Sequence, residues 1–208
     1  MSKKRSTRPQ TPQVRAGRSL AGRRVVVLVW VVFAGLAAVT AFVIVPRGSS
    51  GAGAPEGALA SGPAPAFSER DVVSGRPLST RSLRGKNILL FFSEGVMCQA
   101  CFQQIQALQQ ATAELRARGL TLVSITTDSE GTLGDAAQAY GVVTPLVSDA
   151  DKTMSSAYGA IGVPGAMHSD NLGHTFILVD KRGQIRWRED YAEMYVPPEK
   201  LFDAIPEL

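Results

Sequence analysis

The chain is poor in the two residue types that most often bind transition metals. Its 208 residues include only two cysteines and two histidines. A structural zinc site has four protein ligands, so a site built on Cys98 and Cys101 would need His168, His174 or carboxylates to complete it. A bridge between cysteines this close in sequence would constrain little of the unfolded chain. Redox chemistry is the leading interpretation of the pair, with metal binding, a structural bridge and simple burial as alternatives.

The first 24 residues contain no aspartate or glutamate but eight lysines and arginines. They precede Val25–Val45, a run of 21 residues without a charged side chain. A helix of about 20 apolar residues can cross the hydrocarbon core of a bilayer, and the positive residues before it favour a cytoplasmic N-terminus. We therefore predict a basic cytoplasmic tail over residues 1–24 and an uncleaved transmembrane anchor over 25–45. The alternative, a cleaved signal peptide, normally has an apolar region of about 7 to 15 residues.

The formal net charge of +4 does not indicate a nucleic-acid-binding protein, because the excess of positive charge is confined to the tail. After Arg24 the chain has 14 basic and 18 acidic residues, and no basic patch interleaved with aromatic residues remains. Residues 46–64 are dominated by Gly, Ala, Pro and Ser, a composition typical of a flexible linker. Residues 65–208 are long enough for one domain with its own core. We expect this domain to lie outside the cytoplasm, at the cell membrane.

An apolar strand is predicted to run into a helix at the cysteines. Residues 87–93 form a short apolar, aromatic run typical of a buried strand. After Cys101, apolar residues recur at helical spacing until Gly119, a residue type that commonly ends helices. Cysteines at the start of such a helix face unpaired backbone N–H groups and the positive end of the helix dipole, which favour the thiolate. Glu94, the acidic residue closest to them in sequence, could relay a proton or be a solvated loop carboxylate.

The rest of the domain alternates strands and helices. We predict strands at 120–126 and 146–148, helices near 133–140 and 152–158, a hairpin of strands 175–180 and 184–188, and a last helix over 198–205. The βαβ order at the beginning predicts parallel crossovers, and the hairpin adds antiparallel strands. The predicted fold class is therefore α/β, with helices covering a mixed central sheet.

Three segments carry a resemblance to a known family. They are PAPAFSERDVVSGRPLSTRSLRGKNILLFF before the cysteines, VSDADKTMSSAYG after them, and GHTFILVDKRGQIRW over the hairpin. In this order they resemble the thioredoxin-like superfamily, most closely its redoxin and peroxiredoxin branch, the alkyl hydroperoxide reductase/thiol-specific antioxidant (AhpC/TSA) family, together with membrane-tethered thiol-disulfide oxidoreductases. The resemblance covers residues 63–208 and implies a thioredoxin-like α/β sandwich. It also implies an enzyme, a thiol-disulfide oxidoreductase or a peroxiredoxin-like thiol peroxidase.

The resemblance assigns the two cysteines in opposite ways. In the disulfide oxidoreductases the first cysteine attacks and the second resolves, which makes Cys98 the nucleophile and Cys101 the resolver. In peroxiredoxins the attacking cysteine follows a threonine by three residues, which puts Cys101 in the attacking position and Cys98 in place of the threonine. Residues 172–176, Leu-Gly-His-Thr-Phe, contain neither the arginine of peroxiredoxins nor the cis-proline of thioredoxins. Which cysteine attacks stays open.

His174 is the third candidate site residue. It precedes the strand expected beside the cysteine helix, so its imidazole could hold a proton for the leaving thiolate or, when charged, stabilise Cys98 as a thiolate. Alternatively it is a packed histidine bonded to backbone. Copper chaperones of the Sco type use two cysteines and a histidine near this strand, although their cysteines are normally separated by three residues, against two here. The alternative function is therefore a copper metallochaperone using Cys98, Cys101 and His174.

We predict a membrane-anchored oxidoreductase with antioxidant activity that cycles Cys98 and Cys101 between dithiol and disulfide. It would need no metal or organic cofactor. Its substrate would be a protein disulfide or a peroxide, and its electrons would come from another thiol protein at or outside the membrane. The sequence leaves open the identity of that donor, the choice between the two substrates, the direction of net electron flow and the oligomeric state.

Overall fold

The computed structural model describes residues 59–208. The predicted tail (1–24), the predicted anchor (25–45) and most of the predicted linker (46–64) lie outside the described residues. Among residues 59–208, no helix is long and apolar enough to cross a membrane.

The centre of the domain is a six-stranded mixed sheet with the strand order β1-β8-β7-β4-β5-β6. Parallel pairing joins β4 to β5 and β5 to β6, while β7 runs antiparallel to both β4 and β8. A separate hairpin pairs β2 with β3. The strands are β1 (Gly62–Pro63), β2 (Ser68–Arg70), β3 (Pro77–Ser79), β4 (Asn87–Phe92), β5 (Leu120–Thr126), β6 (Leu146–Ser148), β7 (His174–Val179) and β8 (Gln184–Tyr191).

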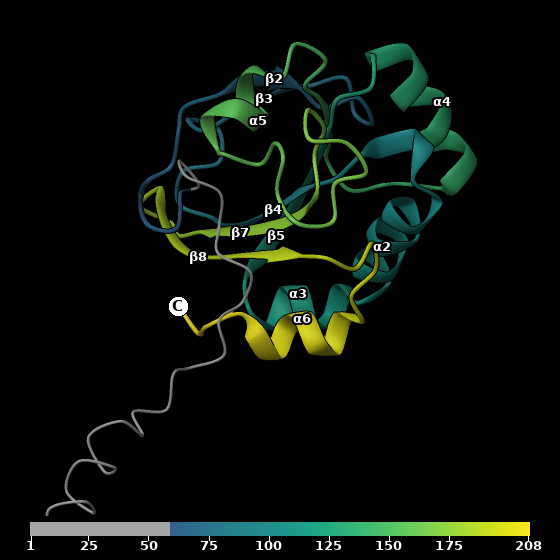
Figure 1. Cartoon of the computed structure of the whole chain (residues 1–208). Helices are drawn as coiled ribbons and strands as arrows, with labels where there is room; N and C mark the ends of the chain where they lie inside the picture. Colours follow the sequence, from purple (N-terminus) through teal and green to yellow (C-terminus); the bar gives the residue numbers. More distant parts are fainter. Residues whose placement is uncertain (1–58) are drawn as a thin grey trace, which may run out of the picture. The chain divides into compact units, whose positions relative to one another are not determined.

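Helices lie on both faces of the sheet. Figure 1 shows α3 and α6 on one side of it, and α5 with β2 and β3 on the other. The helices are the 3-10 turn η1 (Gly95–Met97), α2 (Gln99–Gln110), α3 (Thr112–Ala117), α4 (Glu130–Tyr140), α5 (Thr153–Ala157) and α6 (Pro198–Ala204). The predicted α/β class and mixed sheet are confirmed.

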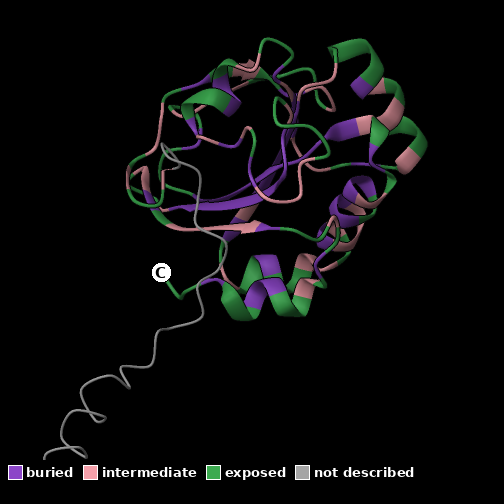
Figure 2. Cartoon of the chain, in the orientation of Figure 1, coloured by how far each residue is buried: buried purple, intermediate pink, exposed green. Residues whose placement is uncertain are grey.

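β4 is buried along its whole length because both of its faces pack into the core. All six of its residues are buried, which explains the continuous apolar sequence. On one face Phe91 belongs to the same core cluster as Phe102 of α2. On the other face Phe92 packs against Tyr158, with the ring centroids 5.4 Å apart. Figure 2 shows the central strands as the buried layer of the domain. This two-sided packing fixes the point at which the chain leaves β4 towards the cysteines.

The helix predicted after Cys101 is present in the structure, but it differs from the prediction in two details. It begins at Gln99, and it is interrupted at Ala111, so that α2 and α3 are separate. The hydroxyl of Thr112 donates to the carbonyl of Gln109, and such local bonds compete with regular helix bonding. Gly119 ends this stretch with a φ of +63°, as expected for a glycine after a helix.

The other predicted elements agree with the structure, and three short strands were not foreseen. The strands at 120–126 and 146–148 have the predicted bounds, and the hairpin of β7 and β8 is present. The strands β1, β2 and β3 have only two or three residues each, too few for a periodic pattern to emerge. β1 pairs with β8, so the sheet begins inside the segment predicted as linker.

A buried histidine begins β7. His174 has no exposed surface, and its ring centroid lies 4.7 Å from that of Phe91 and 5.4 Å from that of Phe176. Neither ring nitrogen has a hydrogen-bond partner among the described residues. Burial lowers the pKa of His174 from 6.5 to about 4, because the charged imidazolium loses its hydration there. The neutral imidazole is therefore the form present at neutral pH.

Protonation of His174 should make the protein less stable in mild acid. The unfolded chain binds this proton below about pH 6.5 and the folded protein only near pH 4, so the free energy of unfolding falls as the pH drops through this window. The expected loss is up to about 3 kcal/mol. Urea unfolding followed by circular dichroism, from neutral pH to about pH 4, measures it.

The substitution His174→Gln should remove this part of the pH dependence. The other histidine of the chain, His168, is exposed, so His168→Gln is the matched control and should behave as the wild type does. An unchanged pH dependence in His174→Gln would contradict the assignment.

Candidate active site

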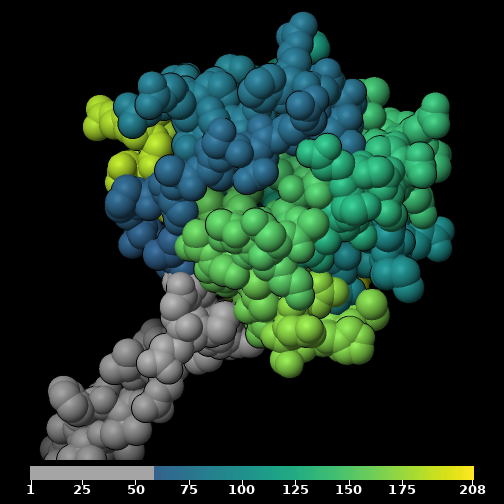
Figure 3. All heavy atoms as spheres, turned by 90° about the horizontal axis from the view of Figure 1, so that it is seen from above, coloured from purple at the N-terminus to yellow at the C-terminus, as the bar shows by residue number. Residues whose placement is uncertain are grey.

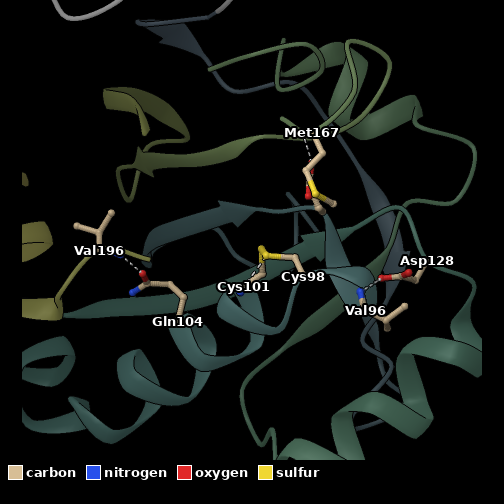
Figure 4. Close-up of a disulfide and its surroundings, with 8 residues drawn as sticks. Val96, Cys98, Cys101, Gln104, Asp128, Met167 and Val196 are labelled. Carbon is tan, nitrogen blue, oxygen red and sulfur yellow. Dashed lines mark hydrogen bonds between the residues drawn. A yellow bond between two sulfur atoms is a disulfide. The ribbon is translucent and has the colours of Figure 1, made fainter. Parts of the chain in front are cut away.

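The two cysteines lie where the chain passes from β4, through η1, into α2. Cys98 caps the start of the helix and Cys101 lies in its first turn. Their sulfur atoms form a disulfide, with the Cα atoms 5.3 Å apart (Figure 4). The backbone N–H of Cys101 donates a hydrogen bond to Sγ of Cys98 at 3.2 Å. The predicted position of the pair, after a buried strand and at the start of a helix, is confirmed.

The two cysteines differ in exposure. Cys98 has 7% of its surface exposed, whereas Cys101 has none. The residue before the pair, Met97, is 81% exposed. A group arriving from solvent therefore meets Cys98 first.

The turn before the cysteines is held by a carboxylate from the segment that follows β5. Oδ2 of Asp128 accepts hydrogen bonds from the N–H of Val96 at 3.0 Å and from the hydroxyl of Thr126 at 2.8 Å. Gly95 has a φ of +82°, and a Cβ atom there would lie 1.8 Å from the same oxygen. Glycine is therefore required at this position, for both its backbone conformation and its size.

Sequence reasoning did not single out Asp128, although a signal was present. Asp128 follows β5 by two residues, and β5 is parallel to β4. Residues that follow neighbouring parallel strands meet at the same edge of a sheet, where the sites of α/β proteins commonly lie. Residues after β5 were thus candidates to contact the loop after β4.

Glu94 is buried, which corrects one interpretation of it. Only 3% of its surface is exposed, so it is not the solvated loop carboxylate considered above. Its Oε1 accepts a hydrogen bond from the N–H of Met167, and its Oε2 is buried without a partner. The hydroxyl of Ser93, the preceding residue, is also buried and unpaired among residues 59–208. Unpaired buried polar groups are costly and concentrate at functional sites.

Gln104 connects α2 to the C-terminal part of the chain. Its side chain is fully buried, and its Oε1 accepts a hydrogen bond from the N–H of Val196 at 2.6 Å (Figure 4). The Nε2 of Gln104 has no partner in the described part of the chain. This bond fixes the segment before α6 against the cysteine-bearing helix.

His174 lies at the start of β7, as predicted. Its imidazole is neutral there, whereas one interpretation of the sequence used a charged imidazolium. Phe92, the last residue of β4, pairs with Thr175 of β7, so His174 lies beside the point where the chain leaves β4. Its lowered pKa disfavours a charged imidazolium in this disulfide form. No group of three or more His, Cys, Asp or Glu residues within residues 59–208 is placed to hold a metal ion, and His168 is exposed.

Comparison with known proteins identifies the family. Residues 61–188 match the profile described as the AhpC/TSA family. Peroxiredoxin Bcp of Escherichia coli is 27% identical over 124 residues, which cover 59% of this chain and 79% of that protein. Peroxiredoxin-4 of Dictyostelium discoideum is 32% identical over 142 residues, covering 60% of this chain and 50% of that protein.

A solved structure agrees with this result. The crystal structure of peroxidoxin BcpB from Mycobacterium tuberculosis superposes with a TM-score of 0.58 at 18% identity, over 71% of this chain and 96% of that one. This likeness shows the fold, a thioredoxin-like α/β fold with a mixed central sheet. The family match spans more than half of the chain and includes both cysteines. The chain therefore belongs to the AhpC/TSA family and is a peroxiredoxin-like enzyme.

Proposed function

We propose that this enzyme reduces peroxides through the Cys98–Cys101 pair, with Cys98 as the attacking residue and Cys101 as the resolving residue. The observation that carries this assignment is the difference in exposure, 7% for Cys98 against none for Cys101. Cys98 is therefore the member of the pair that a peroxide or an external thiol reaches first. The peroxiredoxin pattern would instead assign attack to Cys101, which would have to become exposed first.

The start of α2 provides the activation that Cys98 needs. In the reduced protein its sulfur lies at the N-terminus of a 12-residue helix, next to the N–H of Cys101. The unpaired N–H groups and the helix dipole stabilise a thiolate there. His174 would enter the reaction as a neutral imidazole, with one unprotonated ring nitrogen that can accept a proton from the resolving thiol, and not as a resting cation that stabilises the thiolate.

The reaction balances with two thiols and one external donor. The thiolate of Cys98 attacks the peroxide and takes its terminal OH group, giving a sulfenic acid as the O–O bond breaks. The leaving alkoxide, or hydroxide in the case of hydrogen peroxide, takes a proton from solvent and departs as an alcohol or as water. The thiol of Cys101 then displaces hydroxide, which leaves as water, and the disulfide forms. Two thiols of a donor protein reduce the disulfide by attack at the exposed Cys98, and the donor becomes a disulfide.

Thiol-disulfide exchange with a protein substrate is the second candidate. It is favoured by the contacts of Arg188, which leave this arginine unable to take the role of the peroxiredoxin arginine. This chain has Gly173 and His174 where peroxiredoxins carry an arginine. On the neighbouring strand β8, the guanidinium of Arg188 is already engaged, by Asp190 at 2.8 Å and by the carbonyls of Tyr158 and Gly159. Arg188 is therefore not available to polarise a peroxide. In this second function Cys98 attacks a substrate disulfide instead.

The copper-chaperone alternative is less well supported. The sulfur atoms of Cys98 and Cys101 are bonded to each other in the disulfide, so neither is a thiolate. The buried ring of His174 completes no three-ligand cluster with them in the described domain. Copper would require both reduction of the pair and a third ligand brought to it.

The proposed location is the outer face of the cell membrane. It rests on Val25–Val45 as a single membrane-spanning helix with the basic residues before it in the cytoplasm. The reducing thiol protein would then be a membrane or extracytoplasmic protein, because a bilayer would separate the disulfide from cytoplasmic reductants.

Stopped-flow measurements on the reduced full chain in detergent micelles separate the two activities. The chain is mixed with hydrogen peroxide and, in a second experiment, with a model protein disulfide, each in metal-free buffer. We expect oxidation of the pair by peroxide to outpace exchange with the disulfide. Fast exchange with a sluggish peroxide reaction would establish the second function, and no reaction with either would refute both.

Substitution of the cysteines distinguishes their roles. Cys98→Ser should reduce peroxide consumption to the background rate, because the exposed nucleophile is lost. Cys101→Ser should still react once and hold a sulfenic acid on Cys98, which dimedone labelling and peptide mass spectrometry detect. A dimedone label on Cys101 in the Cys98→Ser variant would reverse the assignment.

A charge in the apolar run tests the membrane anchor. Placing Arg at the centre of a spanning helix costs roughly 2.5–3.5 kcal/mol on insertion scales, so Leu36→Arg should shift the full chain from the carbonate-resistant membrane fraction to the soluble fraction. Leu36→Ala is the control and should remain in the membrane. If the wild-type chain itself is released by alkaline carbonate, the anchor is refuted.

A further inference from the structure

A cleft lies at the opposite end of the sheet from the disulfide. It has a volume of about 860 Å³ and is formed by residues 63–68, residues 79–84 and the turn between β7 and β8. In Figure 3 the atoms of the segment before β4 (blue) lie beside the yellow-green atoms of this turn. Three arginines line the cleft, Arg81, Arg84 and Arg182, and none of its lining residues is acidic.

The guanidinium groups of Arg81, Arg84 and Arg182 have no ion-pair partner within residues 59–208. All three residues are exposed. The ion pairs found within residues 59–208 involve other arginines, namely Arg118, Arg186 and Arg188. The chain after Arg24 is acidic on balance, with 18 acidic and 14 basic residues, so carboxylates were available to neutralise these positions. Three like charges around one cleft repel one another unless an anion lies between them.

The carboxylate of Asp180, two residues before Arg182, is already engaged. Oδ1 of Asp180 accepts hydrogen bonds from the backbone N–H groups of Arg182 and Gln184, both at 2.9 Å. Its Oδ2 lies 3.9 Å from the guanidinium of Arg186. Asp180 therefore shapes the turn that presents Arg182 and does not neutralise its side chain.

We propose that this cleft binds a phosphate-bearing anion. Guanidinium groups pair with phosphate through two parallel hydrogen bonds. A phosphate monoester carries nearly two negative charges at neutral pH and three acceptor oxygens, so it can engage Arg81, Arg84 and Arg182 together. A single carboxylate, with one charge and two oxygens, cannot match all three. The volume lies in the range of small-molecule sites, about 300–1,000 Å³.

Two sources can supply this group, a free phosphorylated compound and phosphatidic acid, the phospholipid whose headgroup is itself a phosphate monoester. The cleft includes apolar surface from Pro63, Ala64 and Phe67 beside the arginines, a combination suited to either. Pro63 also follows the apolar run that ends at Val45 by only a short stretch of sequence. The chemistry recognised is the same in both cases, and the experiment separates them.

The cleft is separate from the redox centre. Gly85, just before β4, donates its N–H to the carbonyl of Lys181 in the β7–β8 turn, whereas the cysteines follow the other end of β4. The six residues of β4 span roughly 20 Å. Figure 1 shows the turn after β7 at one end of the sheet and α2 at the other. A ligand in the cleft would therefore leave Cys98 free to react.

Arginine labelling of the full chain tests the proposal. Phenylglyoxal modifies accessible guanidinium groups, and peptide mass spectrometry reports each site separately. The full chain in detergent micelles is labelled with and without sodium pyrophosphate, with sodium chloride at equal ionic strength as the screening control. The full chain is also labelled in phosphatidylcholine nanodiscs with and without phosphatidic acid. Arg116, exposed on α3 and outside the cleft, is the internal reference.

We expect severalfold slower labelling of Arg81, Arg84 and Arg182 than of Arg116 when the anion is present. Protection by pyrophosphate supports a free phosphorylated ligand, and protection only by phosphatidic acid supports a lipid headgroup. Labelling that is equal at all four arginines in every condition would overturn the proposal.

Substitution of two arginines then tests cooperation between them. In the double variant Arg81→Gln, Arg182→Gln, the remaining Arg84 should lose its protection, because each charge-assisted bond lost weakens binding by about 10-fold or more. Arg116→Gln is the matched control and should leave the protection of Arg84 intact. Persistent protection of Arg84 in the double variant would show that the three residues do not form one site.

Discussion

The contact between Gly95 and Asp128 sets the start of α2 and therefore the position of the reactive pair. The chain leaves β4 buried in the core and must reverse towards a helix within a few residues, and the carboxylate of Asp128 fixes this turn through the N–H of Val96. A side chain at residue 95 would collide with that carboxylate. Because β4 and β5 are parallel neighbours, the carboxylate and the turn come from the same edge of the sheet. The N–H groups at the start of α2 are thereby directed at Cys98.

The two cysteines differ in burial, and the roles that we propose for them rest on this difference. Cys101 lies inside the core with Phe102, while Cys98 caps the helix and keeps a small exposed surface. Buried polar atoms without partners among residues 59–208 lie on Ser93 and Glu94, between β4 and the cysteines, and on His174 at the start of β7. Such atoms lower the stability of a resting protein, and a redox or catalytic role is a recognised reason for keeping them. The neutral state of His174 follows from the same burial.

The sheet keeps two chemically different regions apart. Beyond the end of β4 the disulfide directly follows the exposed Met97 and keeps only a small exposed surface, at Cys98. At the beginning of β4 the arginines of the loop after β3 and of the β7–β8 turn surround a cleft with no acidic lining. In a family of peroxiredoxin-like enzymes, this arrangement lets one end of the domain interact with an anion while the other carries out thiol chemistry. The separation is a consequence of strand length, not of any flexible connection.

The sequence by itself determined the elements whose signals are local. Continuous apolar runs predicted β4 and β5, and helical spacing predicted α2. The Cys-Gln-Ala-Cys segment after a predicted strand indicated the candidate redox pair. Tertiary structure decided what depends on contacts between distant segments. These features are the hydrogen bond from the backbone N–H of Met167 to the buried Glu94, the hydrogen bond from Val96 to Asp128, the two-residue strand β1, and the meeting of Arg81 and Arg84 with Arg182 at one cleft. None leaves a periodic pattern, because each arises only when residues far apart in sequence are brought together by strand pairing.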